Sequence, residues 1–203
     1  VWKELKRLLA APDPASVIET MQKGHVLELL LPGELDLQKL LRLVKLDGKR
    51  AAAPDPLIRI AALTAGPCGD ARASERGSDL GALQDAMRLS KAEAGRLSGF
   101  AAACGAKLDD GPARRAAFYA YGADGVCGAA RLMEAEGALG AAAADRVLEE
   151  AARWERPVFP VRAKDLIARG AEPGPALGAI LKRLEAEWIA SDFAASRDAL
   201  LAR

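Results

Sequence analysis

Residues 164–181 read KDLIARGAEPGPALGAIL, and this stretch has the sequence pattern of a turn between two helices. Gly170 suits the left-handed residue that commonly follows the end of a helix. Residues 173–175, Pro-Gly-Pro, predict a tight turn, and Pro175 has the fixed φ that favours the first position of a new helix. The stretch therefore predicts two helices, over about 163–168 and 175–189, joined by a short turn.

The second of these helices has a continuous apolar face. Its apolar residues recur at intervals of three and four, which is the spacing along one side of an α-helix. They are Leu177, Ile180, Leu181, Leu184 and Trp188. Gly178 lies one turn into the helix, where the absence of a side chain lets another helix or an RNA backbone approach closely. A last helix is predicted after Ala195.

The remainder of the chain also has helical patterns. Hydrophobic residues make up 51% of the sequence but aromatic residues only 4%, so the core must form by close packing of small side chains. No stretch alternates apolar and polar residues, which argues against sheets. Ser90 and Glu93 have the spacing of a capping box, and Asp55-Pro56 is a capping residue followed by proline. Helices are expected over about 2–10, 14–24, 35–46, 56–63, 79–88, 113–121, 125–136 and 141–154, with another after Ser90 and a loop from Thr64 to Ser78.

Two prolines divide the chain. Pro157 and Pro160 interrupt the helical pattern, so we predict a boundary between a larger helical part, residues 1–154, and a smaller helical tail, residues 155–203. The expected fold is all-α, a multi-helix array of packed helix pairs with a smaller C-terminal tail subdomain. No fixed-period repeat is present, which argues against a solenoid of identical units.

Charge and cysteine content restrict the classes of function. The formal net charge is +1, so a nucleic-acid surface must be a local basic patch. Cys68, Cys104 and Cys127 fit no zinc-binding spacing and are expected to be reduced, as in a cytoplasmic protein. The longest apolar runs are too short to cross a bilayer. The chain begins at Val1 inside a helical pattern, which predicts that it is part of a longer protein.

The turn at residues 164–181 resembles that of a known family. Its Asp-Leu, Gly, Pro-Gly-Pro, Leu-Gly and Leu elements, at 165–166, 170, 173–175, 177–178 and 181, match the tail of bacterial CCA-adding tRNA nucleotidyltransferases and their poly(A) polymerase relatives. Ala163 stands where many members have glycine. Weaker likenesses to the neck and body of the family lie upstream and in order, within residues 4–32, 55–63 and 89–93, so the resemblance spans nearly the whole chain.

The resemblance implies the tRNA-gripping neck and body (1–154) and tail (155–203) of such an enzyme without its catalytic head. In the family the head uses CTP and ATP, and an Asp-x-Asp pair in it binds magnesium. This sequence has no Asp-x-Asp. The Glu-x-Glu pairs at 134–136 and 185–187 lie in helical patterns and are predicted to be solvated helix faces. We therefore expect no catalytic residue, metal site or cofactor in this chain, which alone is predicted to be inactive, with Mg²⁺ bound in the missing head.

The resemblance also implies tRNA as the partner, bound through backbone contacts that read shape rather than base sequence. Basic side chains and turn glycines are the predicted RNA contacts: Lys39, Arg42, Lys45, Lys164, Arg169, Gly174, Gly178, Lys182 and Arg183. Within the helix at 35–46, Lys39, Arg42 and Lys45 are predicted to share the face opposite the leucines, and Lys49 and Arg50 follow as further candidates. Neither DNA nor a membrane is an expected partner.

Two alternative functions are open from the sequence. A poly(A) polymerase would use the same helical part on a less defined RNA, and only the head would separate the two activities. A helical protein-interaction module without an RNA role is the second, and the near-neutral charge favours it. Tyr119 and Tyr121 beside Arg114-Arg115 have the chemistry to stack on bases, but a partly buried aromatic pair is the favoured interpretation. His25, the only histidine, is expected in a packing or helix-end role.

Overall fold

Helices are the only regular elements in the part of the chain that the structure describes. The computed structural model describes residues 1–64 and 73–202, and the absence of strands there confirms the predicted all-α class. None of the helices in these ranges is both long and apolar enough to cross a membrane. The described helices are α1 (Trp2–Leu9), α2 (Ala15–Lys23), α3 (Val26–Leu30), α4 (Leu37–Lys49), α5 (Pro56–Thr64), α6 (Ala73–Met87), α7 (Lys91–Ala103), α8 (Gly111–Glu136), α9 (Ala141–Ala151), α10 (Ala163–Ile167), α11 (Pro175–Ala190) and α12 (Arg197–Leu201).

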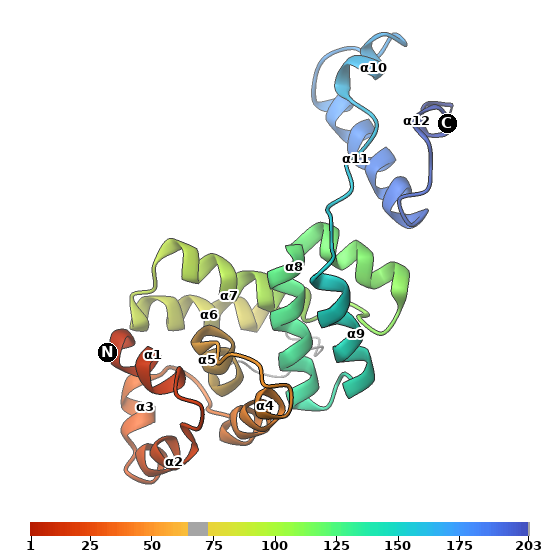
Figure 1. Cartoon of the computed structure of the whole chain (residues 1–203). Helices are drawn as coiled ribbons and strands as arrows, with labels where there is room; N and C mark the ends of the chain where they lie inside the picture. The colour runs from red at the N-terminus through yellow and green to blue at the C-terminus, as the bar shows by residue number, and fades with distance from the viewer. Residues whose placement is uncertain (65–72, 203) are drawn as a thin grey trace.

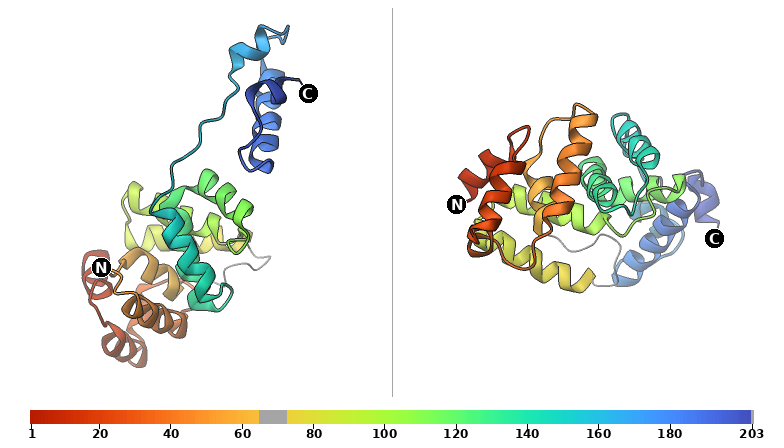
Figure 2. Two further views of the ribbon diagram at one scale, coloured as in Figure 1. Left: turned by 45° about the vertical axis from the view of Figure 1, so that its right-hand side comes forward. Right: turned by 90° about the horizontal axis from the view of Figure 1, so that it is seen from below.

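The helices are arranged as a body and a tail (Figure 1). Helices α1–α9 pack together in the body, and α10–α12 form the tail. The tail lies at the opposite end of the molecule from α1–α3 (Figures 1 and 2). Residues 152–162 connect α9 to α10, and from residue 154 the connection runs as a drawn-out segment without a helix (Figure 1). The division of the chain into two domains, 1–154 and 155–203, stays a prediction.

The body and the tail each contain a cluster of buried apolar side chains. The body cluster extends from α1 to α9 and includes Leu9, Ile60 and Phe118. The tail cluster is built on one side of α11, where Leu177, Leu184 and Trp188 are buried and Ile180 and Leu181 pack against them. The apolar face predicted for this helix is therefore confirmed.

Capping residues begin the helices where the sequence predicts them. The Ser90 hydroxyl accepts a hydrogen bond from the Glu93 N–H (3.3 Å), and the Glu93 carboxylate accepts one from the Ser90 N–H (3.0 Å), which completes a capping box on α7. The Asp55 carboxylate accepts a hydrogen bond from the Leu57 N–H (2.9 Å) at the start of α5. Such caps satisfy backbone donors that have no partner inside the helix.

Glycines allow α7 and α8 to pack closely. A Cβ atom placed on Gly125 in α8 would lie 3.4 Å from the Gly99 carbonyl oxygen in α7. At Gly128 a Cβ atom would lie 2.5 Å from Cε1 and 2.8 Å from Cγ of Phe100, which leaves no room for a side chain. The core of the body therefore depends on the smallest residues at this helix contact, because protein interiors have little free space.

Helix α8 is broken at Gly122. This residue has φ 74° and ψ 163°, a conformation that glycine adopts at low cost. The break separates two helical parts that correspond to the predicted helices at 113–121 and 125–136. Tyr119 in the first part belongs to the tail cluster, whereas Val126 in the second belongs to the body cluster. Helix α8 thus contributes to the packing of both parts of the molecule.

One local expectation is wrong. Helix α6 begins at Ala73, so residues 73–78 are helical rather than part of a loop. Residues 65–72 of that predicted loop lie outside the described residues. Cys68 lies outside the described residues, so the expectation that all three cysteines are reduced stays a prediction. Cys127 is a free thiol, and burial raises its pKa to about 11.

Candidate nucleic-acid interface

Lys39 points into the body rather than to solvent. Its side chain is fully buried, and its Nζ lies 3.6 Å from the carboxylate of Glu136 in α8. The inward side of α4 comprises Lys39, Leu40, Leu43 and Asp47, so the buried stripe contains charge as well as leucine. The prediction that Lys39 shares an exposed face with Arg42 and Lys45 is therefore wrong. A phosphate cannot reach the Lys39 ammonium in this conformation, and we remove it from the candidate interface.

The other two predicted cations of α4 are exposed. Arg42 and Lys45 both face solvent, as does Lys49 four residues further on. Residues separated by three or four positions lie on the same side of a helix. None of the three forms an ion pair with a residue in the described ranges. Arg42, Lys45 and Lys49 thus form one line of unneutralised positive charge, which we call the α4 stripe.

All four predicted cations of the tail are exposed. Lys182 and Arg183 lie on α11, Lys164 lies on α10, and Arg169 follows α10. The Arg169 guanidinium donates a hydrogen bond to the Leu201 carbonyl oxygen, which ties the end of α10 to α12. Within the described residues, Lys164, Lys182 and Arg183 have no ion-pair partner. We refer to Lys164, Arg169, Lys182 and Arg183 as the tail cations.

The two predicted glycines lie on the same exposed hairpin. Gly174 is the N-cap residue of α11 and has φ 153°, which only glycine adopts readily. A Cβ atom placed on Gly178 would meet no atom within 4 Å among the described residues. No other helix of the described chain therefore approaches Gly178, and this side of α11 is open.

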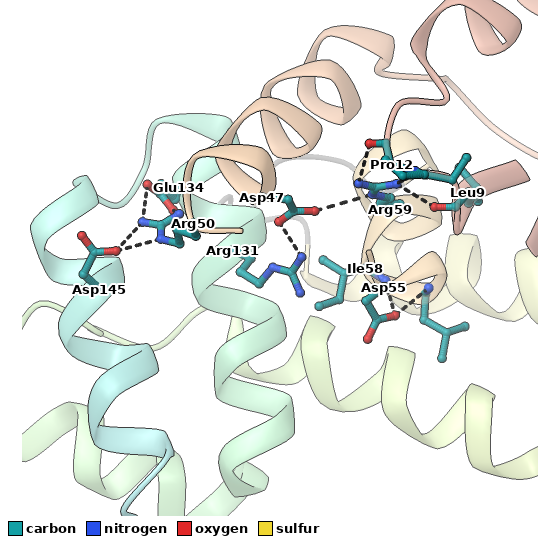
Figure 3. A network of polar contacts seen from close by, with 12 residues as sticks. Leu9, Pro12, Asp47, Arg50, Asp55, Ile58, Arg59, Arg131, Glu134 and Asp145 are labelled. Carbon is teal, nitrogen blue, oxygen red and sulfur yellow. Dashed lines mark hydrogen bonds and ion pairs between the residues drawn. The ribbon is translucent and has the colours of Figure 1, made fainter. Parts of the chain in front are cut away.

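Arg50 is engaged in ion pairs with other helices of the body. Its guanidinium binds Glu134 in α8 through two hydrogen bonds of 2.7 and 2.9 Å and Asp145 in α9 through one of 2.8 Å (Figure 3). The hydrogen bonds to Glu134 are the main cause of a raised pKa of Arg50. Arg50 thus joins the end of α4 to α8 and α9. Because two carboxylates neutralise its charge, it is not a free cation for RNA.

Arg59 is the centre of a second internal network. The side chain is 1% exposed, and Nη1 donates hydrogen bonds to the carbonyl oxygens of Leu9 (2.8 Å) and Ala11 (2.5 Å). Its Nε lies 3.5 Å from the Asp47 carboxylate, which also accepts a hydrogen bond from Arg131 (Figure 3). Burial lowers the pKa of Arg59. These contacts hold the end of α1 against α4, α5 and α8, so these charges are structural.

Tyr119, Arg114 and Arg115 of α8 are engaged in contacts within the molecule. The Tyr119 hydroxyl donates a 2.5 Å hydrogen bond to Glu185, and the Tyr119 ring is buried in the tail cluster. Arg114 pairs with Glu150 at 2.6 Å, and Arg115 pairs with Asp192. For Tyr119 the base-stacking interpretation fails, because its ring is buried. The two arginines beside it are held by carboxylates. Of the two tyrosines only Tyr121, which is 42% exposed, faces solvent.

The Glu-x-Glu pairs hold the fold together. Glu134 binds Arg50, Glu136 lies beside Lys39, and Glu185 accepts the Tyr119 hydrogen bond. The prediction that these are solvated faces is therefore wrong for all three residues. In residues 1–64 and 73–202 no three or more His, Cys, Asp or Glu side chains gather in a way that could hold a metal ion. His25 is the N-cap residue of α3, which is a helix-end position.

Comparisons with known proteins found no match to the chain, either among protein-family models or among curated proteins. The family assignment therefore rests on the resemblance of the α10–α11 hairpin and on the weaker likenesses upstream, and it stays a proposal.

Proposed function

We propose that this chain is the RNA-binding helical part of a tRNA nucleotidyltransferase that adds or repairs the 3′-terminal CCA. The proposal rests mainly on how buried and exposed residues are separated within residues 164–184. The apolar residues Leu166, Leu177 and Leu184 are buried, whereas the predicted RNA contacts of the same hairpin are all exposed. Such a surface offers positive charge and open backbone to a phosphate, which is the chemistry of sequence-independent RNA binding.

In this proposal the chain contributes by orientation. The α4 stripe and the tail cations bind phosphates of the tRNA, and the body keeps the RNA in place while a head absent from this chain supplies the reaction. The parent enzyme would use CTP and ATP with Mg²⁺. A poly(A) polymerase with a related helical part is the close variant.

A protein-interaction module without an RNA role is the second candidate. Two observations favour it: the net charge is only +1, and the arginines at 50, 59, 96, 114, 115 and 131 are all neutralised by carboxylates within the body or at its contact with the tail. This candidate predicts RNA binding that is weak and does not distinguish tRNA from other RNA.

Charge reversal on α11 separates the two candidates. The double variant Lys182→Glu/Arg183→Glu is expected to bind tRNA about tenfold more weakly at low salt and to lower the slope of log K against log salt by about two, because two phosphate contacts are lost. The matched control is Lys3→Glu/Arg7→Glu, which reverses two exposed cations of α1 at the far end of the molecule. Fluorescence anisotropy with labelled tRNA gives both quantities. Equal weakening by both double variants would contradict an interface on α11.

A further inference from the structure

The end of α11 has an unusual backbone. Ser191 is the C-cap residue, and the next two residues, Asp192 and Phe193, have φ values of 56° and 64°. The Asp192 N–H donates to the Ile189 carbonyl oxygen (2.9 Å), and the Phe193 N–H donates to that of Trp188 (3.0 Å). This pattern is a Schellman motif, in which the first left-handed residue is usually glycine. Two consecutive non-glycine residues in this region are strained unless other contacts hold them.

The side chains of both residues contact the body. The Asp192 carboxylate accepts hydrogen bonds from Nε (2.7 Å) and Nη2 (2.5 Å) of Arg115, which belongs to the first part of α8. This two-point geometry is the strong form of an arginine–carboxylate pair. The Phe193 ring lies 5.5 Å from that of Tyr119 in α8 and 6.3 Å from that of Trp154, which follows α9. The strained residues are thus the ones that connect the tail to the body.

A second contact lies beside the first. The Tyr119 hydroxyl donates to Glu185 on α11, and the Arg156 guanidinium lies 4.6 Å above the centre of the Tyr119 ring. Tyr119 comes from the body but packs in the tail cluster, edge-on to Trp188 at 5.7 Å. An aromatic ring with a charged group on its face and a hydrogen-bonded hydroxyl is held in one orientation.

The covalent connection alone does not fix the tail. Residues 155–162 contain no helix, and eight extended residues span up to about 26 Å. The prolines at 157 and 160 stiffen this segment but do not set the angle at which it leaves the body. The orientation of the tail therefore depends on side-chain contacts. They are the contacts of Asp192, Phe193 and Tyr119 together with the packing of Trp154, Phe159 and Val161, from the connecting segment, on the tail cluster.

We propose that the turn 191–193 is a strained latch that fixes the tail on the first part of α8. Asp192 occupies a position suited to glycine because its carboxylate is needed to bind Arg115, and the cost of the left-handed backbone is offset by that contact. The latch holds the α4 stripe and the tail cations at a fixed separation. Only this consequence for RNA rests on the proposed function.

Two substitutions at Asp192 separate the backbone from the contact. Asp192→Asn keeps a residue that tolerates the left-handed region but removes the charge, whereas Asp192→Gly relieves the backbone and removes the whole side chain. Small-angle X-ray scattering is expected to show a larger radius of gyration and a broader distance distribution for both variants. The control is Arg197→Gln, which removes an ion pair of 2.8 Å inside the tail and is expected to scatter like the parent.

The glycine variant gives the sharper readout. Because glycine suits the Schellman position, the helix content and melting temperature of Asp192→Gly are expected to equal or exceed those of the parent while the tail is released. Scattering identical to the parent for both variants would overturn the proposal. A loss of helix content in Asp192→Gly would also overturn it, since the turn would then only terminate α11.

RNA binding tests the consequence separately. In Asp192→Asn the preference for tRNA over unstructured RNA of equal length is expected to fall about fivefold, the effect of losing one good ion pair, with the salt slope unchanged. Failure of the parent chain to bind tRNA would refute the proposed function and leave the scattering result to decide on the latch.

Discussion

Replacement of Gly128 by alanine tests the close packing of α7 on α8 with a single methyl group. The new Cβ atom would lie 2.5 Å from Cε1 and 2.8 Å from Cγ of Phe100, whereas carbon atoms in contact are about 3.5–4.0 Å apart. The Phe100 ring is 1% exposed, and the Arg96 guanidinium lies 5.4 Å from its centre. The ring must therefore shift by about an ångström into a filled interior.

Two opposing terms set the magnitude. Alanine in place of glycine inside a helix gains about 1 kcal/mol in helix propensity. Overpacking of a core costs about 1–3 kcal/mol, and a displacement of this size in a buried aromatic ring belongs at the upper end. The net expectation is a loss of about 1–2 kcal/mol, which for a chain of this length lowers the melting temperature by roughly 3–6 °C.

Thermal unfolding followed by circular dichroism measures this loss. The matched control is Gly95→Ala in α7, where a Cβ atom would meet nothing within 4 Å among the described residues and stability is expected to rise by about 0.5–1 kcal/mol. Phe100→Leu in the Gly128→Ala background is expected to recover part of the loss, because the smaller side chain can yield. A Gly128→Ala variant as stable as Gly95→Ala would refute the packing described for these helices.

Two further predictions concern the charged groups of the body. Arg59→Met is expected to destabilise the chain by about 3–5 kcal/mol in urea unfolding. The reason is that the carbonyl oxygens of Leu9 and Ala11 lose their buried donor and Asp47 loses one of its cations. A loss below about 1 kcal/mol would show that the network is dispensable. The hydrogen bond from Lys6 is the largest of the contacts that lower the pKa of Glu93 to about 2. The stability that ionised Glu93 gives to the folded chain is therefore complete above pH 4.5 and is lost as the pH falls towards 2. Because Glu93 is near the surface, the parent is expected to lose only about 1 kcal/mol more than Glu93→Gln between pH 5 and pH 2.5, and equal pH profiles of the two would contradict this.

The sequence predicts the tail hairpin well because the signals there are local. Glycine and proline determine the turn, and the apolar residues of α11 recur at helical spacing within a single helix. The capping box at Ser90 and the cap at Asp55 are also local, since each involves residues within three positions. The break in α8 at Gly122 follows from the gap between two helical patterns.

The burial of charged residues could not be predicted in the same way. Lys39 and Arg42 both have cationic side chains, but the face of α4 that turns inward is determined by contacts with α8, and Glu136 lies far from Lys39 along the chain. The Glu-x-Glu pairs have the sequence pattern of exposed helix faces, and only their partners, which are distant along the chain, show that they are engaged in contacts. Asp192 is an ordinary polar residue in the sequence, and only the left-handed backbone and the distant Arg115 reveal its contact.

Binding of the parent chain to labelled full-length tRNA at two salt concentrations, with unstructured RNA of equal length as the competitor, tests the central claim most directly. The chain is expected to bind tRNA in preference to the competitor, and the binding is expected to weaken steeply with salt, because phosphate contacts release counterions. Failure to bind at low salt, or equal binding of the two RNAs without salt dependence, would contradict it.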